Sequence, residues 1–426
     1  MARRLNVLIT AHEFSPFNGS ECAEGWMLVN EIAKYHNVTV IFATGSQKDN
    51  TQYIRHLEIF LKSNILANYI TFINIDQPFF SIILSRFNFC FFKRGVIGLP
   101  ILYFLAYKLW EYKTYLFVKK LIKFSNFDII HHLTQISFRE PGFLWKLGIP
   151  FVWGPTGGYT SIPFRFWLSL PFKVKVFELV RFISNIYQFN YSKNVKSALS
   201  IAATIYTFTD QDFKRLLRCT KGNVYKMTDS GSYSNMNDRE ILKSTEKIKI
   251  LWVGQLIERK SPFIFLDSIP REEFYTNQIE ITIIGDGYLR KKLIKYLKNN
   301  SLNVNFILNV DHHLVLALLA ESNVLVHTSY REAASNIILE AMSTGNAIIC
   351  HDIDGIALAV DENCGIKVPL VSKNESVIGF NFGIKYLIEN RDFLYECQYN
   401  ALKRAKHISW EQMARKISKD YLNIIK

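Results

Sequence analysis

The feature that most constrains the fold is a regular alternation of strand-like and helix-like segments from residue 247 onward. Short runs of β-branched and aliphatic residues, such as 248–253 and 324–326, are separated by amphipathic stretches. Continuous apolar runs of this kind are typical of strands buried on both faces, and a helix between successive strands favours parallel pairing. We therefore predict a doubly wound parallel sheet of the Rossmann-like α/β class for residues 247–408.

The first half of the chain shows the same alternation less regularly. Residues 6–10 predict a buried first strand, followed by a turn and an amphipathic helix containing Trp26, and residues 204–210 predict the last strand of this half. Residues 235–247 are polar and charged and lack an apolar period, as expected of a boundary between domains. At 426 residues the chain is too long for one ordinary core, so we predict a second Rossmann-like domain over residues 1–240.

Two glutamates flank the start of one predicted helix. The apolar run ending at Val326 is followed by a loop that carries Glu332. Ser335 is a suitable N-cap and Gly345 a suitable C-terminal cap, so we expect a helix from Asn336 to about Thr344. At about 100° per residue, one narrow strip of this helix is polar and the rest is apolar. The polar strip consists of Asn336, Glu340, Ser343 and Thr344.

A mostly buried helix with a polar strip must turn that strip toward a cleft or a ligand. Its first amides follow the end of a parallel strand, where free N–H groups and the positive end of the helix dipole favour an anion such as phosphate. The alternative is that Glu332 is a loop carboxylate beside Arg331 and that Glu340 is an ordinary solvated residue. These residues alone leave both interpretations open.

A glutamate, seven further residues and a second glutamate opening an "EAM" helix that ends at glycine resemble the retaining family 4 glycosyltransferases, whose fold is called GT-B. The resemblance implies that Glu332 approaches the donor sugar and that Glu340 binds the ribose hydroxyls of the nucleotide. It also implies that the amides of Asn336 and Ile337 face the diphosphate.

The resemblance extends to other loops. The family places a glycine and, six residues later, a lysine against the diphosphate, and Gly254 and Lys260 match this spacing. Gln255 stands where the family has a second cation, so that charge is either missing or supplied by Arg259. Gly19, in the loop after the first strand, inherits a position beside the donor phosphates. By the same resemblance, the C-terminal helix at 409–426 crosses back to the first domain.

A histidine pair follows an apolar run in the first domain. The run reaches His131 and His132, and a strand end there should open toward the cleft. Histidine accepts a proton near neutral pH, so either residue could orient an acceptor hydroxyl as a catalytic group, although adjacent histidines are often structural. In the family a second histidine follows two residues after the first. Leu133 occupies that place, which leaves the choice between His131 and His132 open.

The charge is unevenly distributed. The chain carries a formal net charge of +14, and residues 51–200 hold 18 Lys and Arg against 6 acidic residues. This half is also rich in aromatic and aliphatic residues and shows none of the patterns of nucleic-acid-binding modules. We therefore expect an anionic membrane surface rather than nucleic acid as a partner of this basic, aromatic region.

The stretch 99–118 is the most apolar part of this region. Lys108, Glu111 and Lys113 lie near its middle, and each such charge costs about 2.5 to 3.5 kcal/mol at the centre of a bilayer. A position in the membrane interface, with Lys119 and its neighbours at anionic head groups, costs far less. The alternative is an aromatic-rich core or inter-domain segment. Both alternatives remain, and a membrane span is excluded.

The cysteines and the N-terminus bear on location. The six cysteines never approach a Cys-x-x-Cys spacing, which argues against a zinc site and a disulfide framework. The apolar run after Arg4 is too short for a signal peptide. We expect a cytoplasmic protein, peripheral on the inner face of the cell membrane.

Taken together, the resemblance implies a hexosyltransferase-like glycosyltransferase. It would move a sugar from a nucleoside-diphosphate sugar to a polysaccharide or lipid-linked glycan acceptor with retention of anomeric configuration, and it would need no metal or further cofactor. Stabilisation of the leaving diphosphate would be the task of Lys260 and the nearby amides. Two rivals are a nucleotide-sugar epimerase or phosphorylase of the same architecture, and a catalytically inactive relative that binds a membrane or a partner.

Overall fold

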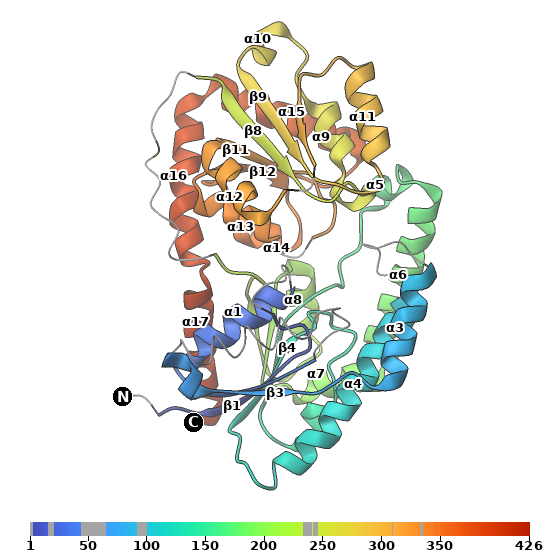
Figure 1. Ribbon diagram of the computed structural model, residues 1–426, viewed down its shortest axis with the longest axis vertical. Helices are drawn as coiled ribbons and strands as arrows, with labels where there is room; N and C mark the ends of the chain where they lie inside the picture. Colours follow the sequence, from blue (N-terminus) through green and yellow to red (C-terminus); the bar gives the residue numbers. More distant parts are fainter. Residues whose placement is uncertain are drawn as a thin grey trace.

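The computed structural model describes residues 3–15, 21–43, 65–91, 100–232, 241, 246–308, 310–332 and 335–426. The chain forms two α/β domains, one above the other along the long axis of the molecule (Figure 1). The predicted α/β fold class, with two Rossmann-like domains of GT-B type, is confirmed.

The described elements of the first domain, in chain order, are β1 (Asn6–Ala11), α1 (Glu21–Ala33), β2 (Asn37–Phe42), η1 (Ile65–Tyr69), β3 (Ile70–Asn74), α3 (Phe79–Phe91), α4 (Pro100–Leu121), β4 (Ile129–Thr134), η2 (Leu144–Leu147), β5 (Phe151–Thr156), α5 (Phe164–Leu168), α6 (Phe172–Tyr191), α7 (Lys193–Ile201), β6 (Thr204–Thr207), α8 (Asp210–Leu216) and β7 (Asn223–Lys226).

Those of the second domain, with the final helix, are β8 (Ile248–Val253), η3 (Glu258–Lys260), α9 (Pro262–Ser268), α10 (Glu273–Thr276), β9 (Ile279–Ile284), α11 (Arg290–Asn299), β10 (Asn305–Ile307), α12 (His312–Glu321), β11 (Val324–His327), α13 (Asn336–Ser343), β12 (Ala347–His351), α14 (Asp354–Ala359), β13 (Gly365–Val368), α15 (Lys373–Glu389), α16 (Arg391–His407) and α17 (Trp410–Ile425).

The described strands pair in parallel within two sheets. The first has the order β3-β2-β1-β4-β5-β6-β7 and the second the order β10-β9-β8-β11-β12-β13. The strand order therefore reverses between β1 and β4 in one domain and between β8 and β11 in the other. Ligands of doubly wound sheets bind at the carboxyl ends of the strands at such reversals.

One strand was not expected from the sequence. The predicted last strand of the first domain, β6, is followed by β7, which pairs with it from Thr204 to Thr207. Only Val224 is buried among the residues of β7, so this edge strand lacks the continuous apolar run that marks the central ones. Residues 233–240 and 242–245, in the predicted linker, lie outside the described residues.

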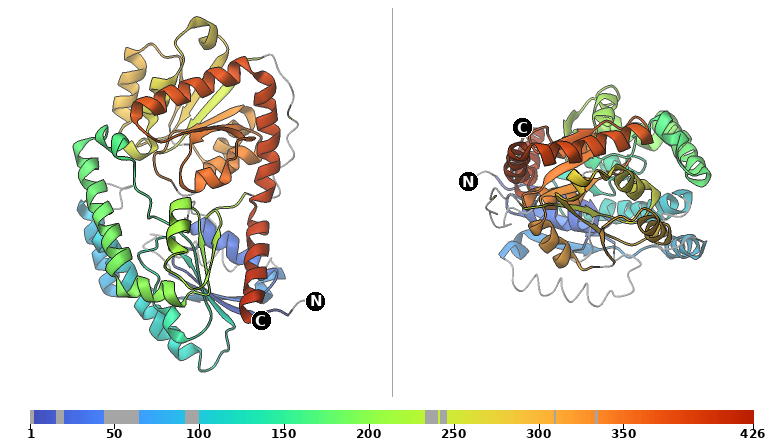
Figure 2. Two further views of the ribbon diagram at one scale, coloured as in Figure 1. Left: turned by 180° about the vertical axis from the view of Figure 1, so that it is seen from behind. Right: turned by 90° about the horizontal axis from the view of Figure 1, so that it is seen from above.

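Helix α17 packs on the first domain although it follows the second in sequence. Its Met413, Ala414, Ile417 and Tyr421 are buried in the same apolar cluster as Val7 of β1. Figure 2, viewed from behind, shows α16 over the second domain and α17 continuing alongside the first. The alternating apolar spacing of α17 explains the packing, because it gives the helix one continuous buried side.

Helix α4 contains most of the apolar stretch discussed above. Tyr107, Trp110, Thr114 and Val118 form its buried side, while Tyr112 and other residues on the opposite side are exposed. The core interpretation therefore holds for one side of the helix. Among the described residues, no helix combines the length and the apolar character that a membrane span requires.

Candidate active site

The candidate site lies where β8 and β11 end, at the reversal of strand order in the second domain. Gly254 follows β8, and the loop from Thr328 to Glu332 follows β11. Both strands are buried runs of aliphatic residues, so their ends are fixed by the core of the sheet. The sequence placed the site residues on these two loops, and the structure brings the loops together.

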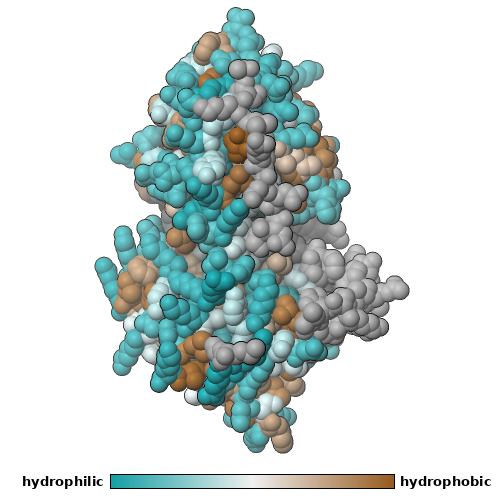
Figure 3. Space-filling view, turned by 90° about the vertical axis from the view of Figure 1, so that its left-hand side faces the viewer, coloured by the Kyte–Doolittle hydropathy of each residue, from teal (hydrophilic) through white to brown (hydrophobic). Residues whose placement is uncertain are grey.

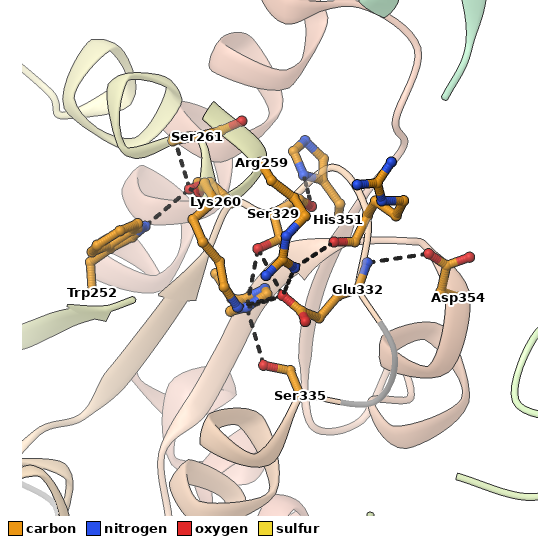
Figure 4. Close-up of polar contacts among 12 residues, drawn as sticks. Trp252, Arg259, Lys260, Ser261, Ser329, Glu332, Ser335, His351 and Asp354 are labelled. Atoms are coloured by element: carbon orange, nitrogen blue, oxygen red, sulfur yellow. Dashed lines mark hydrogen bonds and ion pairs between the residues drawn. The ribbon is translucent and has the colours of Figure 1, made fainter. Parts of the chain in front are cut away.

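Glu332 is the centre of an ionic cluster (Figure 4). Its Oε2 accepts a hydrogen bond from Arg259 Nη1 at 2.7 Å, another from Lys260 Nζ, and one from Ser329 Oγ at 3.2 Å. Two cations thus share one carboxylate, and the cluster keeps a positive charge. Arg259, named from the sequence as one alternative for the cation absent at Gln255, therefore lies beside Lys260 on the same carboxylate.

The protonation of Glu332 follows from its surroundings. Burial by itself would raise the pKa of this carboxyl, but Lys260 and Arg259 outweigh it and hold the pKa at about 2. Burial lowers the pKa of Lys260 in spite of Glu332. The pKa of Lys260 falls because the lysine is desolvated and also faces Arg259. The ion pair therefore stabilises the fold less than the pKa of Glu332 alone suggests.

The two cations are presented by a short 3₁₀ turn, η3, rather than by a capped helix start. Ser261 has φ of 50° and makes no side-chain cap, because its hydroxyl donates to Glu258 O at 2.9 Å. Pro262 occupies the first position of α9. Thr328 Oγ1 lies 2.9 Å from Lys260 O and 3.0 Å from Trp252 Nε1, which ties η3 to the ends of both strands.

Helix α13 begins at Asn336, as predicted, but Ser335 does not cap it. Ser335 has φ of 65°, and its hydroxyl lies 3.3 Å from His327 Nε2. His327 is buried at the end of β11 and lies 4.0 Å from Glu332 Oε2. Burial and the charge of Lys260 lower the pKa of His327 to about 3, so the imidazole is neutral at physiological pH. The serine therefore supports the ionic cluster and leaves the helix uncapped by its side chain.

The polar strip of α13 faces the space between the two domains. Asn336, Glu340 and Ser343 line a pocket whose far wall is formed by Ala23 of α1 and Trp410 of α17. Glu340 Oε1 lies 2.9 Å from His312 Nε2, and its side chain is 15% exposed. The pocket lies between the faces of the two domains, where the sequence had suggested a cleft or ligand.

Of the remaining predicted donor residues, Gly254 lies against the stem of Lys260. A side chain at Gly254 would approach Trp252 to 3.3 Å and Lys260 to 3.6 Å, so the glycine lets the lysine lie close to the strand end. Ile337 is half-buried in the first turn of α13. Gly19 lies outside the described residues.

His131 and His132 are inside the first domain. They belong to β4, which continues to Thr134, so adjacent side chains point to opposite faces of the sheet. The nitrogens of His131 lie against the Tyr421 hydroxyl and, at 2.6 Å, Gly154 O. His132 Nδ1 lies 3.0 Å from Thr10 Oγ1. Burial lowers the pKa of His131 to about 4 and that of His132 to about 3. A role at an acceptor stays a prediction, and it would require these bonds to change.

Several charged residues near the site were not singled out from the sequence. Arg331 Nη1 pairs with Glu178 of α6, which joins the two domains beside Glu332. The amide of Glu332 lies 3.3 Å from Asp354 Oδ2, and burial raises the pKa of Asp354 to about 6. Arg331 and Asp354 also line a second cavity of about 350 Å³ between the domains, within the usual size range of ligand pockets. No local pattern marks these residues, because their partners come from distant segments.

The described residues contain no group of three or more His, Cys, Asp or Glu side chains that could hold a metal ion. Asp352 and Asp354 are two residues apart in the sequence but have different partners. Asp352 lies 3.5 Å from Lys367, whereas Asp354 faces the site.

Comparison with known proteins finds a family model that matches part of the chain. The family model described as "Glycosyl transferases group 1" matches residues 234–404, which include the ionic cluster and the polar strip of α13. This part of the chain is similar to the glycosyl transferases group 1 domain. The match covers the strands, loops and helices on which Gly254, Lys260, Glu332 and Glu340 lie.

Two relatives match parts of the chain in sequence. The GPI3 subunit of phosphatidylinositol N-acetylglucosaminyltransferase from Saccharomyces cerevisiae is 22% identical over 43% of this chain and 40% of its own length. An uncharacterized glycosyltransferase of Methanocaldococcus jannaschii is 29% identical over 34% of this chain and 36% of its own. The chain thus spans about two fifths of the length of these relatives.

Solved structures share the whole fold. Sucrose-phosphate synthase from Thermosynechococcus elongatus superposes with a TM-score of 0.63 at 14% identity, covering 99% of both chains. Anabaena HepE in complex with UDP and glucose superposes with a TM-score of 0.57 at 14% identity, covering 99% of this chain and all of that one. At such identities the likeness establishes the two-domain architecture.

Proposed function

We propose that the protein is a retaining glycosyltransferase that takes a sugar from a nucleoside diphosphate. The observation that carries the proposal is the cluster of Lys260, Arg259 and Glu332 at the carboxyl ends of β8 and β11. Its two cations exceed its one carboxylate, and it adjoins the loop that leads to the N-terminus of α13. This arrangement suits a diphosphate.

The chemistry follows from where charge develops. As the bond between the sugar and the diphosphate breaks, negative charge grows on the leaving phosphate and positive charge on the sugar ring. Lys260 and Arg259 stabilise the former, and Glu332 lies beside them for the latter. Because the groups are held by the 3₁₀ turn and the strand ends, little reorganisation is needed when the donor reacts.

In the proposal, the nucleoside part of the donor lies at the interdomain pocket. Glu340 and Asn336 project into it from α13, and in the proposal Glu340 accepts hydrogen bonds from the ribose hydroxyls. Structures with the same fold carry UDP and glucose or UDP-2-fluoro glucose, which supports a nucleotide sugar as the donor class. The acceptor would enter from the first domain and is proposed to be a glycan or a lipid-linked glycan.

The test is donor binding by a matched pair of lysine variants. The wild type is incubated with UDP- and GDP-sugars, and the rise in melting temperature is recorded for each. Lys260→Ala should lose most of the rise, because a charge-assisted bond to a phosphate is worth about 1.5 to 3 kcal/mol. Lys249→Ala should keep the rise in melting temperature, since Lys249 is exposed on β8, at the end of the strand away from Gly254.

A panel that produces no stabilisation, or equal stabilisation of both variants, would refute the donor site. Product analysis with the best donor then separates the rivals. An epimerase would return a changed nucleotide sugar, a phosphorylase would require inorganic phosphate, and an inactive relative would release no nucleoside diphosphate.

A further inference from the structure

Helix α6 differs from an ordinary surface helix in the direction that its two sides face. Its inward side carries Glu178, Arg181 and Asn185, of which Glu178 and Asn185 are buried. An amphipathic helix at the surface of a globular protein normally places its apolar side inward. In α6 the polar residues Glu178 and Asn185 are buried together with Phe189, while most of the other apolar residues are exposed.

Specific contacts fix this orientation. Glu178 pairs with Arg331 of the second domain, and Arg181 Nη2 and Asn185 Nδ2 each donate to Gly158 O at 3.1 Å. Arg139 also donates to Asn185 Oδ1. Rotating the helix to bury its apolar side would break these bonds and expose the backbone carbonyl they satisfy, so the outward position of the apolar residues is part of the fold.

The outward side forms a continuous apolar surface. We define the outer face as the exposed apolar residues of α5 and α6, which are Phe164, Leu168, Phe172, Val176, Phe177, Leu179, Val180, Phe182, Ile183, Ile186, Tyr187 and Tyr191. Phe172 is 79% exposed and Tyr191 69%, so both ends of α6 present large aromatic side chains to solvent. Exposed apolar surface of this extent marks an interaction site.

Helix α3 adds to the same edge of the molecule. Phe79, Phe80, Ile83 and Phe87 are exposed on it. In Figure 1 α3 and α6 both lie along the right-hand edge, and the view from above in Figure 2 places both at that edge again. The opposite side of the molecule, seen in Figure 3, is covered mainly by hydrophilic residues, with apolar residues in small separate areas.

The charges around the outer face have one sign. Arg86, Arg165 and Lys173 are exposed on α3, α5 and α6, and Lys175 is half-exposed. The one acidic residue in these three helices is Glu178, which is turned inward and paired with Arg331. A binding partner must therefore offer an apolar layer together with negative charge.

These observations choose between possible occupants. A second copy of the chain would bring like charges against each other, which costs several kcal/mol at an interface. An anionic bilayer offers acyl chains for Phe172 and Ile183 and lipid head groups for Arg165 and Lys173. None of the helices in the described part of the chain is suited to cross the bilayer, so the contact is confined to its surface.

We propose that the outer face of α5 and α6, together with the exposed side of α3, docks on an anionic lipid bilayer with these helices lying in the interface. The proposal assigns the membrane contact expected for the basic aromatic region 51–200 to one defined surface. The side of α4 that is packed in the core is not part of this surface. Docking does not depend on the proposed sugar transfer. Because Arg331 precedes Glu332 and pairs with the inner side of α6, the docked surface would lie directly behind the donor site.

The experiment measures co-sedimentation with vesicles of phosphatidylcholine alone or with about a third phosphatidylglycerol, at low salt. The wild type should bind the anionic vesicles, and salt should weaken binding by screening. Val176→Ser with Ile183→Ser should lower the affinity at least about tenfold, because both side chains lose apolar burial in the bilayer. Arg165→Gln with Lys173→Gln should lower it roughly 10- to 30-fold from the loss of two cations near the surface.

The matched control is Ile294→Ser with Ile378→Ser in the second domain. Those two side chains are 46% and 67% exposed, against 45% and 56% for Val176 and Ile183, so the control removes similar apolar groups elsewhere. It should bind as the wild type does. As a readout that needs no variant, hydrogen exchange of the wild type should slow in residues 164–191 when anionic vesicles are added.

Three results would overturn the proposal. They are a wild type that stays in solution with anionic vesicles at low salt, outer-face variants that bind as well as the control, and hydrogen exchange at 164–191 that vesicles leave unchanged. A wild type that is dimeric and a Val176→Ser, Ile183→Ser variant that is monomeric, without vesicle binding, would assign the surface to a second copy. The donor-binding test above is independent of all these outcomes.

Discussion

Replacing Glu332 by glutamine tests both the electrostatics and the chemistry of the site. The change keeps the shape of the side chain but leaves Lys260 and Arg259, whose side chains are 13% and 29% exposed, without their shared counter-ion. A pKa of about 2 in the folded protein, against 4.5 for an ordinary glutamate, corresponds to roughly 3 kcal/mol. Burial lowers the pKa of Lys260, which offsets part of this, so we expect a loss of about 1 to 3 kcal/mol.

The pH dependence has a defined sign. Because folding depresses the pKa of Glu332, its contribution to stability is fully present above about pH 5 and is lost as the pH falls toward 2. The wild type should therefore lose more stability than the variant between pH 5 and pH 2. At pH 7 the variant should melt a few degrees lower, whereas Glu321→Gln, at the exposed end of α12, should melt as the wild type does.

Ligand binding should reverse the effect. UDP or GDP restores negative charge between the two cations, so either nucleotide should raise the melting temperature of Glu332→Gln at least as much as that of the wild type. With the best sugar donor, kcat should fall while KM changes little, since the carboxylate matters most when positive charge develops on the sugar. A variant with unchanged stability, unchanged kcat and no response to nucleotide would refute this account of the site.

Two further substitutions probe neighbouring contacts. Glu340→Gln should mainly raise the KM for the donor, on the order of ten- to a hundredfold, because the ribose hydroxyls do not change during the reaction. Steady-state kinetics with Glu321→Gln as the control measures this effect, and an unchanged KM would contradict it. Glu178→Gln should lower the melting temperature by the equivalent of about 1 to 3 kcal/mol, because it leaves Arg331 half-buried without its partner; equal melting of variant and wild type would show that the inter-domain pair adds no stability.

The fold was predictable because its signal is local. Buried runs such as Ile248–Val253 and Val324–His327 are recognisable as strands, and Asn336 and Gly345 bracket α13 as the sequence indicated. Strand β7 was missed because an edge strand carries few apolar residues. The cap predicted at Ser335 was wrong because the serine hydroxyl lies beside His327 Nε2 instead of the helix amides.

The site was predictable only where its residues lie on recognisable loops. Glu332 was placed on a loop after a predicted strand, Lys260 was identified through the resemblance to the family, and Arg259 was named as the alternative cation. The sequence did not indicate the contacts of Arg331, Glu178 and Asp354, because each joins separate segments. Arg331 and Glu178 are 153 residues apart, and Asp354 approaches the amide of Glu332 from 22 residues further along the chain. The contacts of His131 also depend on α17, whose Tyr421 lies 290 residues away in the sequence.

The orientation of α6 also could not be predicted from the sequence. The sequence of α6 shows one polar side and one apolar side, and the usual rule assigns the apolar side to the core. The reversal is decided by Arg331, Arg139 and the carbonyl of Gly158, which supply partners for the polar side and come from other segments. Composition could therefore predict that a basic aromatic region meets an anionic surface, but only the tertiary contacts of Glu178 and Asn185 determine which side of which helix is free to do so.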